Sequence, residues 1–149
     1  IERCNKQLPK IFQYKTAADN NSLYNTPPTF GIYLIRNVLA WIKDTGGIER
    51  VEKDNREKAR MLYEVIDEHA EMFRCPVDNG SRSTMNVVFT LPSQELEDKF
   101  IKEAKAESMV GLKGHRSVGG VRVSLYNAVS VGWVRTLCEF MESFASRNW

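Results

Sequence analysis

The spacing of apolar side chains changes along this chain from a helical period to a strand-like one. Over residues 30–42 and 48–69, apolar residues recur at three- and four-residue steps, which is typical of helices with one apolar face. The charged run over residues 52–58 predicts the solvated face of the second helix. Residues 85–91 are instead rich in strand-forming side chains, and residues 121–126 alternate between apolar and polar. A chain that mixes these two periods must pack helices against a sheet.

Three more elements complete the predicted order. Ser93 precedes a helical stripe, residues 109–112 form a short strand candidate, and apolar residues from Val131 to Phe144 predict a closing helix. The order is therefore helix, helix, strand, helix, strand, strand, helix. It predicts an α+β fold in which helices pack on one face of a small, mostly antiparallel sheet. The broad apolar face of the helix over residues 30–42 predicts that this helix is well buried.

Charge and cysteine usage argue against several classes of function. The net charge is +2, which gives no reason to expect nucleic acid or an anionic membrane as a partner. No apolar run approaches the roughly 20 residues that a membrane-spanning helix needs. The cysteines, Cys4, Cys75 and Cys138, are widely separated, so neither a zinc site nor a disulfide framework is indicated. This cysteine usage favours a reducing, cytoplasmic setting.

The run from Lys113 to Arg122 is the strongest candidate for a functional site. It holds His115, Arg116 and Arg122 around three glycines. The arginine guanidinium presents a planar fork of donors that matches carboxylate and phosphate oxygens, and glycine lets the backbone approach a ligand or turn sharply. The run therefore predicts capture of a small substrate with more than one anionic group, on a loop between two strands. The plainer alternatives are a surface loop with a capping histidine and an arginine on a solvated strand face.

A second candidate lies just before the first long helix. Asn25 and Thr26 precede Pro27 and Pro28, and proline suits the first turn of a helix. Short polar side chains and backbone N–H groups near a helix start suit a phosphate group. The alternative is that Thr26 only caps the helix and Asn25 makes a turn, and the residues by themselves favour this alternative.

Four blocks of the sequence resemble one enzyme family in the same order. The blocks are residues 22–30, 83–87, 114–120 and 122–128. They are similar to segments in the C-terminal part of the phosphoserine aminotransferases, which are class V aminotransferases of fold type I. The resemblance covers nearly the whole chain. It implies that residues 1–29 are the end of the large cofactor-binding domain, and that residues 30–149 are the linking helix and the small C-terminal domain.

The resemblance also implies an activity for the full-length enzyme. Such an enzyme transfers an amino group between glutamate and 3-phosphohydroxypyruvate to give phosphoserine, in serine and pyridoxine biosynthesis. Its cofactor is pyridoxal 5′-phosphate, and it is a cytoplasmic homodimer that binds neither nucleic acid nor a membrane. The lysine that forms the Schiff base is expected in the large domain, outside this chain. No catalytic residue is therefore assigned here, and the chain alone is expected to be inactive.

By the same resemblance, five residues receive roles. Asn25 and Thr26 would hold the cofactor phosphate of the other subunit. His115 and Arg116 would bind the substrate phosphate or the side-chain carboxylate of glutamate, and Arg122 would bind the α-carboxylate. No metal is expected in the site.

Two rival functions stay open. One is a non-catalytic, truncated module that binds anions or oligomerises, since exposed apolar residues of the helix at 30–42 would favour self-association. The other is a fold type I aminotransferase with a different substrate. The Gly-His-Arg loop favours the phosphorylated substrate over this second rival.

Overall fold

The chain forms two compact units, Ile1–Asp44 and Thr45–Trp149. The computed structural model describes residue 5 and residues 7–148, so Cys4 lies outside the described residues. Within this described part of the chain, no helix is both long enough and apolar enough to cross a membrane.

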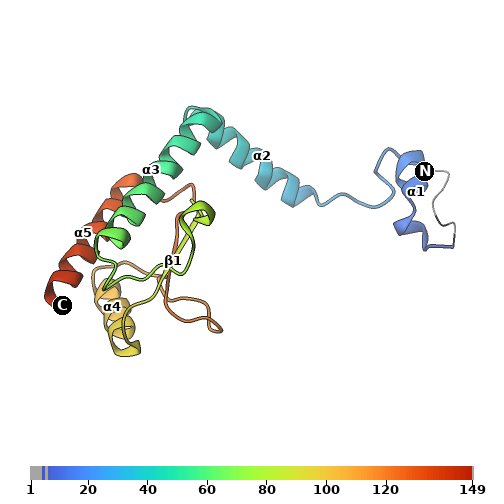
Figure 1. The fold of residues 1–149 in the computed structure, drawn as a ribbon. Helices are drawn as coiled ribbons and strands as arrows, with labels where there is room; N and C mark the ends of the chain where they lie inside the picture. Colours follow the sequence, from blue (N-terminus) through green and yellow to red (C-terminus); the bar gives the residue numbers. More distant parts are fainter. Residues whose placement is uncertain (1–4, 6, 149) are drawn as a thin grey trace. The chain divides into compact units, whose positions relative to one another are not determined.

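The first unit is made of short helical elements and one long helix (Figure 1). A 3-10 helix, η1 (Lys10–Phe12), leads into α1 (Tyr14–Asp19), and α2 (Thr29–Asp44) follows after an irregular stretch. The two prolines before Thr29 supply the fixed backbone that a first helical turn needs, and the N–H of Ile32 donates to the carbonyl of Pro28 at 3.1 Å. The predicted helix over residues 30–42 is therefore confirmed.

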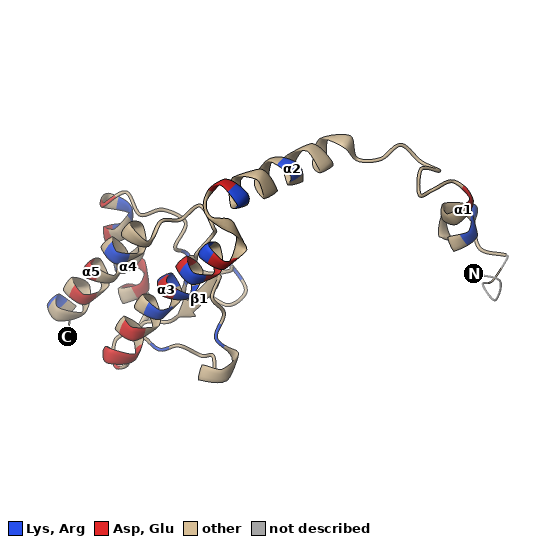
Figure 2. Cartoon of the chain, turned by 90° about the horizontal axis from the view of Figure 1, so that it is seen from above, with Lys and Arg blue, Asp and Glu red and all other residues tan. Residues whose placement is uncertain are grey.

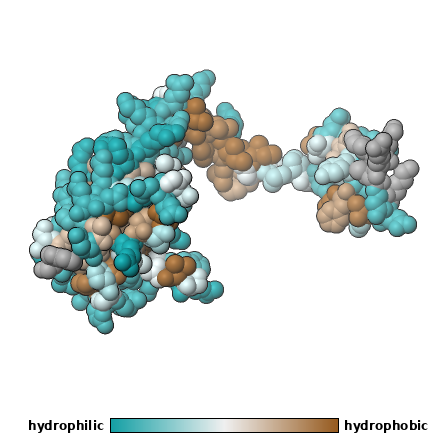
Figure 3. Space-filling model, viewed as in Figure 1, coloured by the Kyte–Doolittle hydropathy of each residue, from teal (hydrophilic) through white to brown (hydrophobic). Residues whose placement is uncertain are grey.

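The expected burial of this helix is wrong. No residue of α2 is buried, and most of its large apolar side chains are about half exposed or more. Phe30 is 73% exposed and Ile35 is 61% exposed, and Figure 3 shows the apolar surface of α2 in brown. Helical periodicity establishes that a helix has an apolar face, but it does not establish that the surface covering that face belongs to the same chain.

The second unit is an α+β arrangement of three long helices and a small sheet. The helices are α3 (Gly47–Glu68), α4 (Gln94–Ala106) and α5 (Val131–Asn148), with a 3-10 turn, η2 (Asn79–Ser81), after α3. Strands β1 (Asn86–Phe89) and β2 (Val121–Ser124) pair antiparallel, from Asn86 opposite Ser124 to Phe89 opposite Val121. Helices α3 and α5 lie side by side (Figure 1). The predicted fold class, with helices on one face of a small antiparallel sheet, is confirmed.

The strand predicted over residues 109–112 does not form. Residues 109–112 are irregular, and the only pairing next to them is an isolated bridge between Lys113 and Val121. Ser108 and Gly111 adopt left-handed backbone angles, with φ of 67° and 81°, which interrupt the extended conformation that a strand requires. The described sheet therefore has two strands.

Phe100 of α4 lies at the centre of the core. Its exposed fraction is 0%, and its ring centroid lies 5.1 Å from those of Phe140 and Phe144 on α5. It also lies 5.9 Å from Phe89 on β1 and 6.0 Å from Phe73, mostly in edge-to-face geometry. One side chain thereby holds α4 against both the sheet and the last helix.

Lys58 is a charged residue buried in the same unit. Its exposed fraction is 1%, and its Nζ donates to the carbonyl oxygens of Tyr126 at 2.8 Å and Val129 at 2.9 Å. Burial lowers the pKa of Lys58, while the Asp54 carboxylate acts in the opposite direction. The interpretation of residue 58 as part of a solvated face is therefore wrong, because its four-residue spacing from Leu62 places it on the buried stripe of α3.

Removing the Phe100 ring is expected to destabilise the fold strongly. Phe100→Ala should lower the free energy of unfolding by about 3–5 kcal/mol, because it leaves a cavity where four rings meet. Urea unfolding followed by far-UV circular dichroism measures this change. Val118→Ala, at a side chain that is 80% exposed, is the control and should change stability by less than about 0.5 kcal/mol. Equal losses in the two variants would contradict the central place of Phe100.

The lowered pKa of Lys58 predicts how stability depends on pH. Between that lowered pKa and the ordinary lysine value, the unfolded chain binds more protons than the folded chain, so the free energy of unfolding rises with pH. Lys58→Met should remove this rise. It should also cost about 1–3 kcal/mol, because two carbonyl groups lose their donor.

Urea unfolding over a series of alkaline pH values measures both effects. Lys53→Met is the matched control, because Lys53 is exposed on the same helix. The control should keep the rise with pH. An unchanged slope in Lys58→Met would show that the titration of Lys58 does not contribute to stability.

Candidate anion-binding site

The loop over residues 113–120 is closed at its base by backbone hydrogen bonds. The N–H of Gly114 donates to the carbonyl of Gly120 at 2.8 Å, and the N–H of Arg122 donates to the carbonyl of Leu112 at 2.8 Å. Lys113 and Val121 form an antiparallel bridge between these two bonds. The loop is therefore fixed directly to the start of β2, although no third strand supports it.

Two glycines are required by the backbone itself. Gly120 has a left-handed φ of 69°, and a Cβ atom there would lie 2.8 Å from the carbonyl oxygen of Phe89 on β1. A Cβ at Gly114 would overlap the carbonyl oxygen of Gly119. These glycines let the loop pack against itself and against the sheet. The glycines thus allow a close approach between backbone segments of this chain.

His115 and Arg116 lie at the exposed part of the loop. The carbonyl of His115 accepts from the N–H groups of Val118 at 2.9 Å and Gly119 at 2.8 Å, which makes a tight turn. Nδ1 of His115 lies 2.7 Å from Oγ of Ser117 and accepts from the Ser117 N–H at 3.3 Å. These contacts assign the proton of the neutral ring to Nε2, which leaves Nε2 as a donor for a ligand.

Arg122 lies on β2, on the face of the sheet opposite the core. Its neighbours Val121 and Val123 are buried, whereas Arg122 is half-buried and pairs in register with Val88. Its Nε is buried, and no described residue accepts a hydrogen bond from it. A buried donor without a partner costs about 1–3 kcal/mol, so the site fits an acceptor from a ligand.

Arg82 differs from Arg122 in that its guanidinium is already paired with a carboxylate. Its Nε is also buried without a partner, but Nη1 and Nη2 each lie 2.6 Å from a carboxylate oxygen of Asp67. Its guanidinium also lies 4.6 Å from the centre of the Tyr63 ring. The fork of Arg82 is thereby occupied. Within the described part of the chain, no carboxylate forms an ion pair with Arg122, so its fork is available to an anion.

Asn25 and Thr26 belong to the first unit, and both are exposed. Asn25 lines a small hollow of about 110 Å³ together with Ser22 and Tyr24. Helix α2 begins at Thr29, so Thr26 lies outside the N-cap position. The alternative in which Thr26 only caps the helix is therefore not supported by the position of the helix start.

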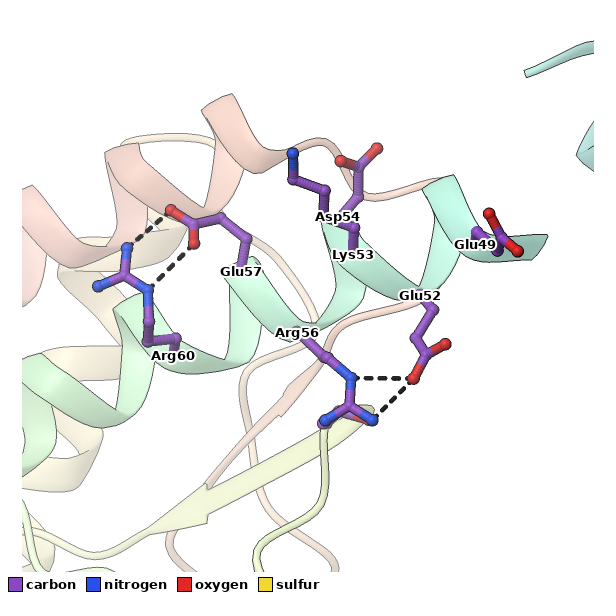
Figure 4. A pocket seen from close by; sticks show the side chains of 8 residues that line it. Glu49, Glu52, Lys53, Asp54, Arg56, Glu57 and Arg60 are labelled. Carbon is purple, nitrogen blue, oxygen red and sulfur yellow. Dashed lines mark hydrogen bonds and ion pairs between the residues drawn. The ribbon is translucent and has the colours of Figure 1, made fainter. Parts of the chain in front are cut away.

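A larger hollow of about 750 Å³ runs along α3, and Figure 4 shows the side chains that line it. Its arginines are paired with carboxylates: Arg56 lies 2.7 Å from Glu52, and Arg60 lies 2.7 Å from Glu57 and 2.6 Å from Glu64. Figure 2 shows the mixed charges of this helix. None of the residues predicted to bind a ligand lines this hollow, and its guanidinium groups are already engaged.

One residue of the site was missed by the sequence analysis. Glu97 of α4 is 7% exposed, and its two carboxylate oxygens accept from the N–H groups of Leu91 at 3.3 Å and Gly120 at 3.2 Å. Its three-residue spacing from the buried Phe100 is the signal that could have placed it on the inner face of α4.

Comparisons with known proteins agree with the fold. The aminotransferase class-V family matches residues 5–137. The chain is 50% identical over 148 residues to a phosphoserine aminotransferase of Herpetosiphon aurantiacus, covering 99% of this chain and 41% of that protein. It is 52% identical over 139 residues to the phosphoserine aminotransferase of Niallia circulans, covering 93% of this chain and 38% of that protein.

Solved structures give the same result. The phosphoserine aminotransferase from Bacillus circulans subsp. alkalophilus superimposes with a TM-score of 0.88 at 48% identity, over 100% of this chain and 41% of that one. The pyridoxal-phosphate-bound phosphoserine aminotransferase from Trichomonas vaginalis does so with a TM-score of 0.77 at 34% identity, over 93% of this chain and 39% of that one. The chain thus spans about two fifths of the length of these relatives. The match over residues 5–137 shows that the chain belongs to the aminotransferase class-V family.

Proposed function

We propose that this chain is the C-terminal part of a phosphoserine aminotransferase, which transfers an amino group between glutamate and 3-phosphohydroxypyruvate. The similarity to enzymes of that name over nearly the whole chain supports the proposal. Residues 1–29 would end the large domain, and residues 30–149 would form the linking helix and the small domain. The whole enzyme would be a cytoplasmic homodimer that serves serine and pyridoxine biosynthesis.

The residues of the chain fit a pyridoxal 5′-phosphate cofactor. Asn25 and Thr26 present exposed amide and hydroxyl groups in a polar stretch just before α2, and such groups suit a phosphate. When bound, this cofactor withdraws electrons from the α-carbon of the amino acid. The lysine that holds it would lie in the large domain. The role of this chain would be to bind and orient the cofactor phosphate and the substrate.

The observation that carries the proposal is the unpartnered, buried Nε of Arg122. Its strand is fixed by the ladder with β1, so the backbone that carries the guanidinium is held in place before any ligand binds. A planar fork of donors matches the two oxygens of an α-carboxylate. Lysine could not replace it, because an ammonium group is a point donor.

His115 and Arg116 would bind the other end of the substrate. They are exposed on a loop whose base is fixed to the start of Arg122's own strand. Glutamate and phosphoserine both carry an α-carboxylate and a distal anion, so one site can serve both halves of the reaction. Holding both ends fixes the α-carbon and removes part of the entropic barrier.

The rival proposal of a non-catalytic module rests on one observation, the exposed apolar face of α2. Such a face favours self-association of the chain in isolation. The two proposals differ in a direct test. If the chain serves only as a binding module, the complete protein binds anions, but adding glutamate does not change its cofactor absorbance. If it is part of an aminotransferase, glutamate changes that absorbance.

Replacing Arg122 by lysine in the complete enzyme is expected to impair both substrates. Arg122→Lys should lower kcat/KM for phosphoserine and for glutamate by about 10- to 100-fold, as for the loss of one charged hydrogen bond of about 1.5–3 kcal/mol. Steady-state kinetics with each substrate measure this. Arg135→Lys, at an exposed position on α5, is the control. If Arg122→Lys reacts like the control with both substrates, the α-carboxylate assignment fails.

Truncating Arg116 separates the two ends of the substrate. Arg116→Ala should raise KM for phosphoserine and for glutamate about tenfold, because each loses a charged bond to its distal anion. The single-turnover rate with L-alanine, which has no distal anion, should not change. The cofactor absorbance under single-turnover conditions gives this second rate. A loss of the same size with L-alanine would assign Arg116 a role other than binding the distal group.

A further inference from the structure

We infer that Glu97 is a positioning residue for the substrate-binding loop. The inference rests on the proposed function for what the loop binds, but it concerns a residue to which no role in that function has been given. Glu97 lies on α4 and is buried, whereas His115 and Arg116 are exposed. It therefore acts through the backbone and not by contact with the substrate.

The first step is the contact itself. One carboxylate oxygen of Glu97 accepts from the N–H of Leu91, just beyond the end of β1, at 3.3 Å. The other oxygen accepts from the N–H of Gly120, at the end of the loop, at 3.2 Å. A single side chain therefore joins α4, the sheet and the loop, and each of its oxygens has a backbone donor. Hydrogen bonds to an ionised carboxylate are stronger than those between neutral groups.

The second step is what Gly120 transmits. Its carbonyl accepts from the N–H of Gly114 at 2.8 Å, and Gly114 immediately precedes His115. On its other side, Gly120 is followed by Val121 and Arg122 on β2. A continuous path therefore runs from the buried carboxylate through Gly120 and Gly114 to the loop that carries His115 and Arg116. Arg122 is held separately, by the pairing of β2 with β1.

The third step is that the position of Gly120 is demanding. Its left-handed φ of 69° and the close approach of the Phe89 carbonyl restrict the backbone conformation at this residue. An N–H held there without an acceptor would be buried and unpaired, because Gly120 itself is buried. Glu97 supplies that acceptor.

The sign of the expected effect distinguishes positioning from electrostatics. A negative charge near an anion site opposes binding, so removing the charge would strengthen binding if electrostatics dominated. Glutamine has the shape of glutamate, but its amide nitrogen cannot accept a hydrogen bond. Glu97→Gln therefore leaves one of the two N–H groups without an acceptor. If positioning dominates, binding becomes weaker.

The experiment uses the complete enzyme with bound cofactor and the variants Glu97→Gln, Glu97→Asp and Asp98→Asn. Asp98 is the matched control, because it lies next to Glu97 on α4 but is exposed. KM and kcat are measured with phosphoserine and glutamate. The single-turnover rate with L-alanine is followed in the cofactor absorbance. Thermal unfolding and the cofactor spectrum report whether each variant is folded.

For Glu97→Gln, we expect KM to rise about tenfold for both dianionic substrates, with kcat changed less than about twofold and the rate with L-alanine unchanged. Glu97→Asp keeps the charge but has a shorter side chain, so it should show the same pattern with a smaller rise in KM. It serves as the test if Glu97→Gln does not fold. Asp98→Asn should match the unchanged enzyme.

Three results would overturn the inference: an unchanged KM, a lower KM, or a loss with L-alanine as large as that with glutamate. The Arg116→Ala variant keeps this failure distinct from failure of the proposed function. If Arg116→Ala raises KM and the Glu97 variants do not, only the role of Glu97 is wrong. If Arg116→Ala has no effect on either substrate, the assignment of the loop to substrate binding is wrong.

Discussion

The packing of Phe100 places helix α4, and the candidate site depends on that placement. The ring lies against Phe89 of the sheet and against Phe140 and Phe144 of α5. Glu97 lies one turn earlier on the same face of α4, so the contacts that bury Phe100 also bring the carboxylate to the N–H groups of Leu91 and Gly120. The aromatic core thus sets the position of a buried polar contact.

Two buried charges fasten the chain on either side of Arg122. Glu97 accepts from the N–H of Gly120, two residues before Arg122, and Lys58 donates to the carbonyls of Tyr126 and Val129 after it. Both side chains bind backbone groups, and backbone groups keep their charge state at every pH at which the protein is folded. Such contacts hold the backbone on both sides of the strand that carries Arg122, and neither of them occupies its guanidinium.

The sequence predicts those elements whose pattern is local. The strand at Val121–Ser124 and the helix at Gln94–Ala106 could be predicted, since alternation and helical spacing act within a few residues. The strand at 109–112 was predicted wrongly because its residue types favour an extended backbone, whereas Ser108 and Gly111 have left-handed φ angles. Ser108 lies in the turn that ends α4, where the N–H of Met109 donates to the carbonyl of Ala104 at 2.9 Å. The burial of α2 was misjudged because periodicity reports an apolar face and not what covers it.

The site residues divide along the same line. His115, Arg116 and Arg122 stand out by residue type and by the glycines around them, so the sequence indicates them directly. Glu97 and Lys58 occur among many other charged residues, and a charge on a helix is ordinarily exposed. Only their helical spacing from Phe100 and Leu62 distinguishes them. A charged residue on the buried stripe of a helix must find a partner, because leaving the charge unpaired costs more than the fold gains from burying its stem. Here all four partners are backbone groups, and those of Gly120, Tyr126 and Val129 belong to the segments that flank Arg122. A charge on the buried stripe of a helix therefore indicates which segments the fold holds in place.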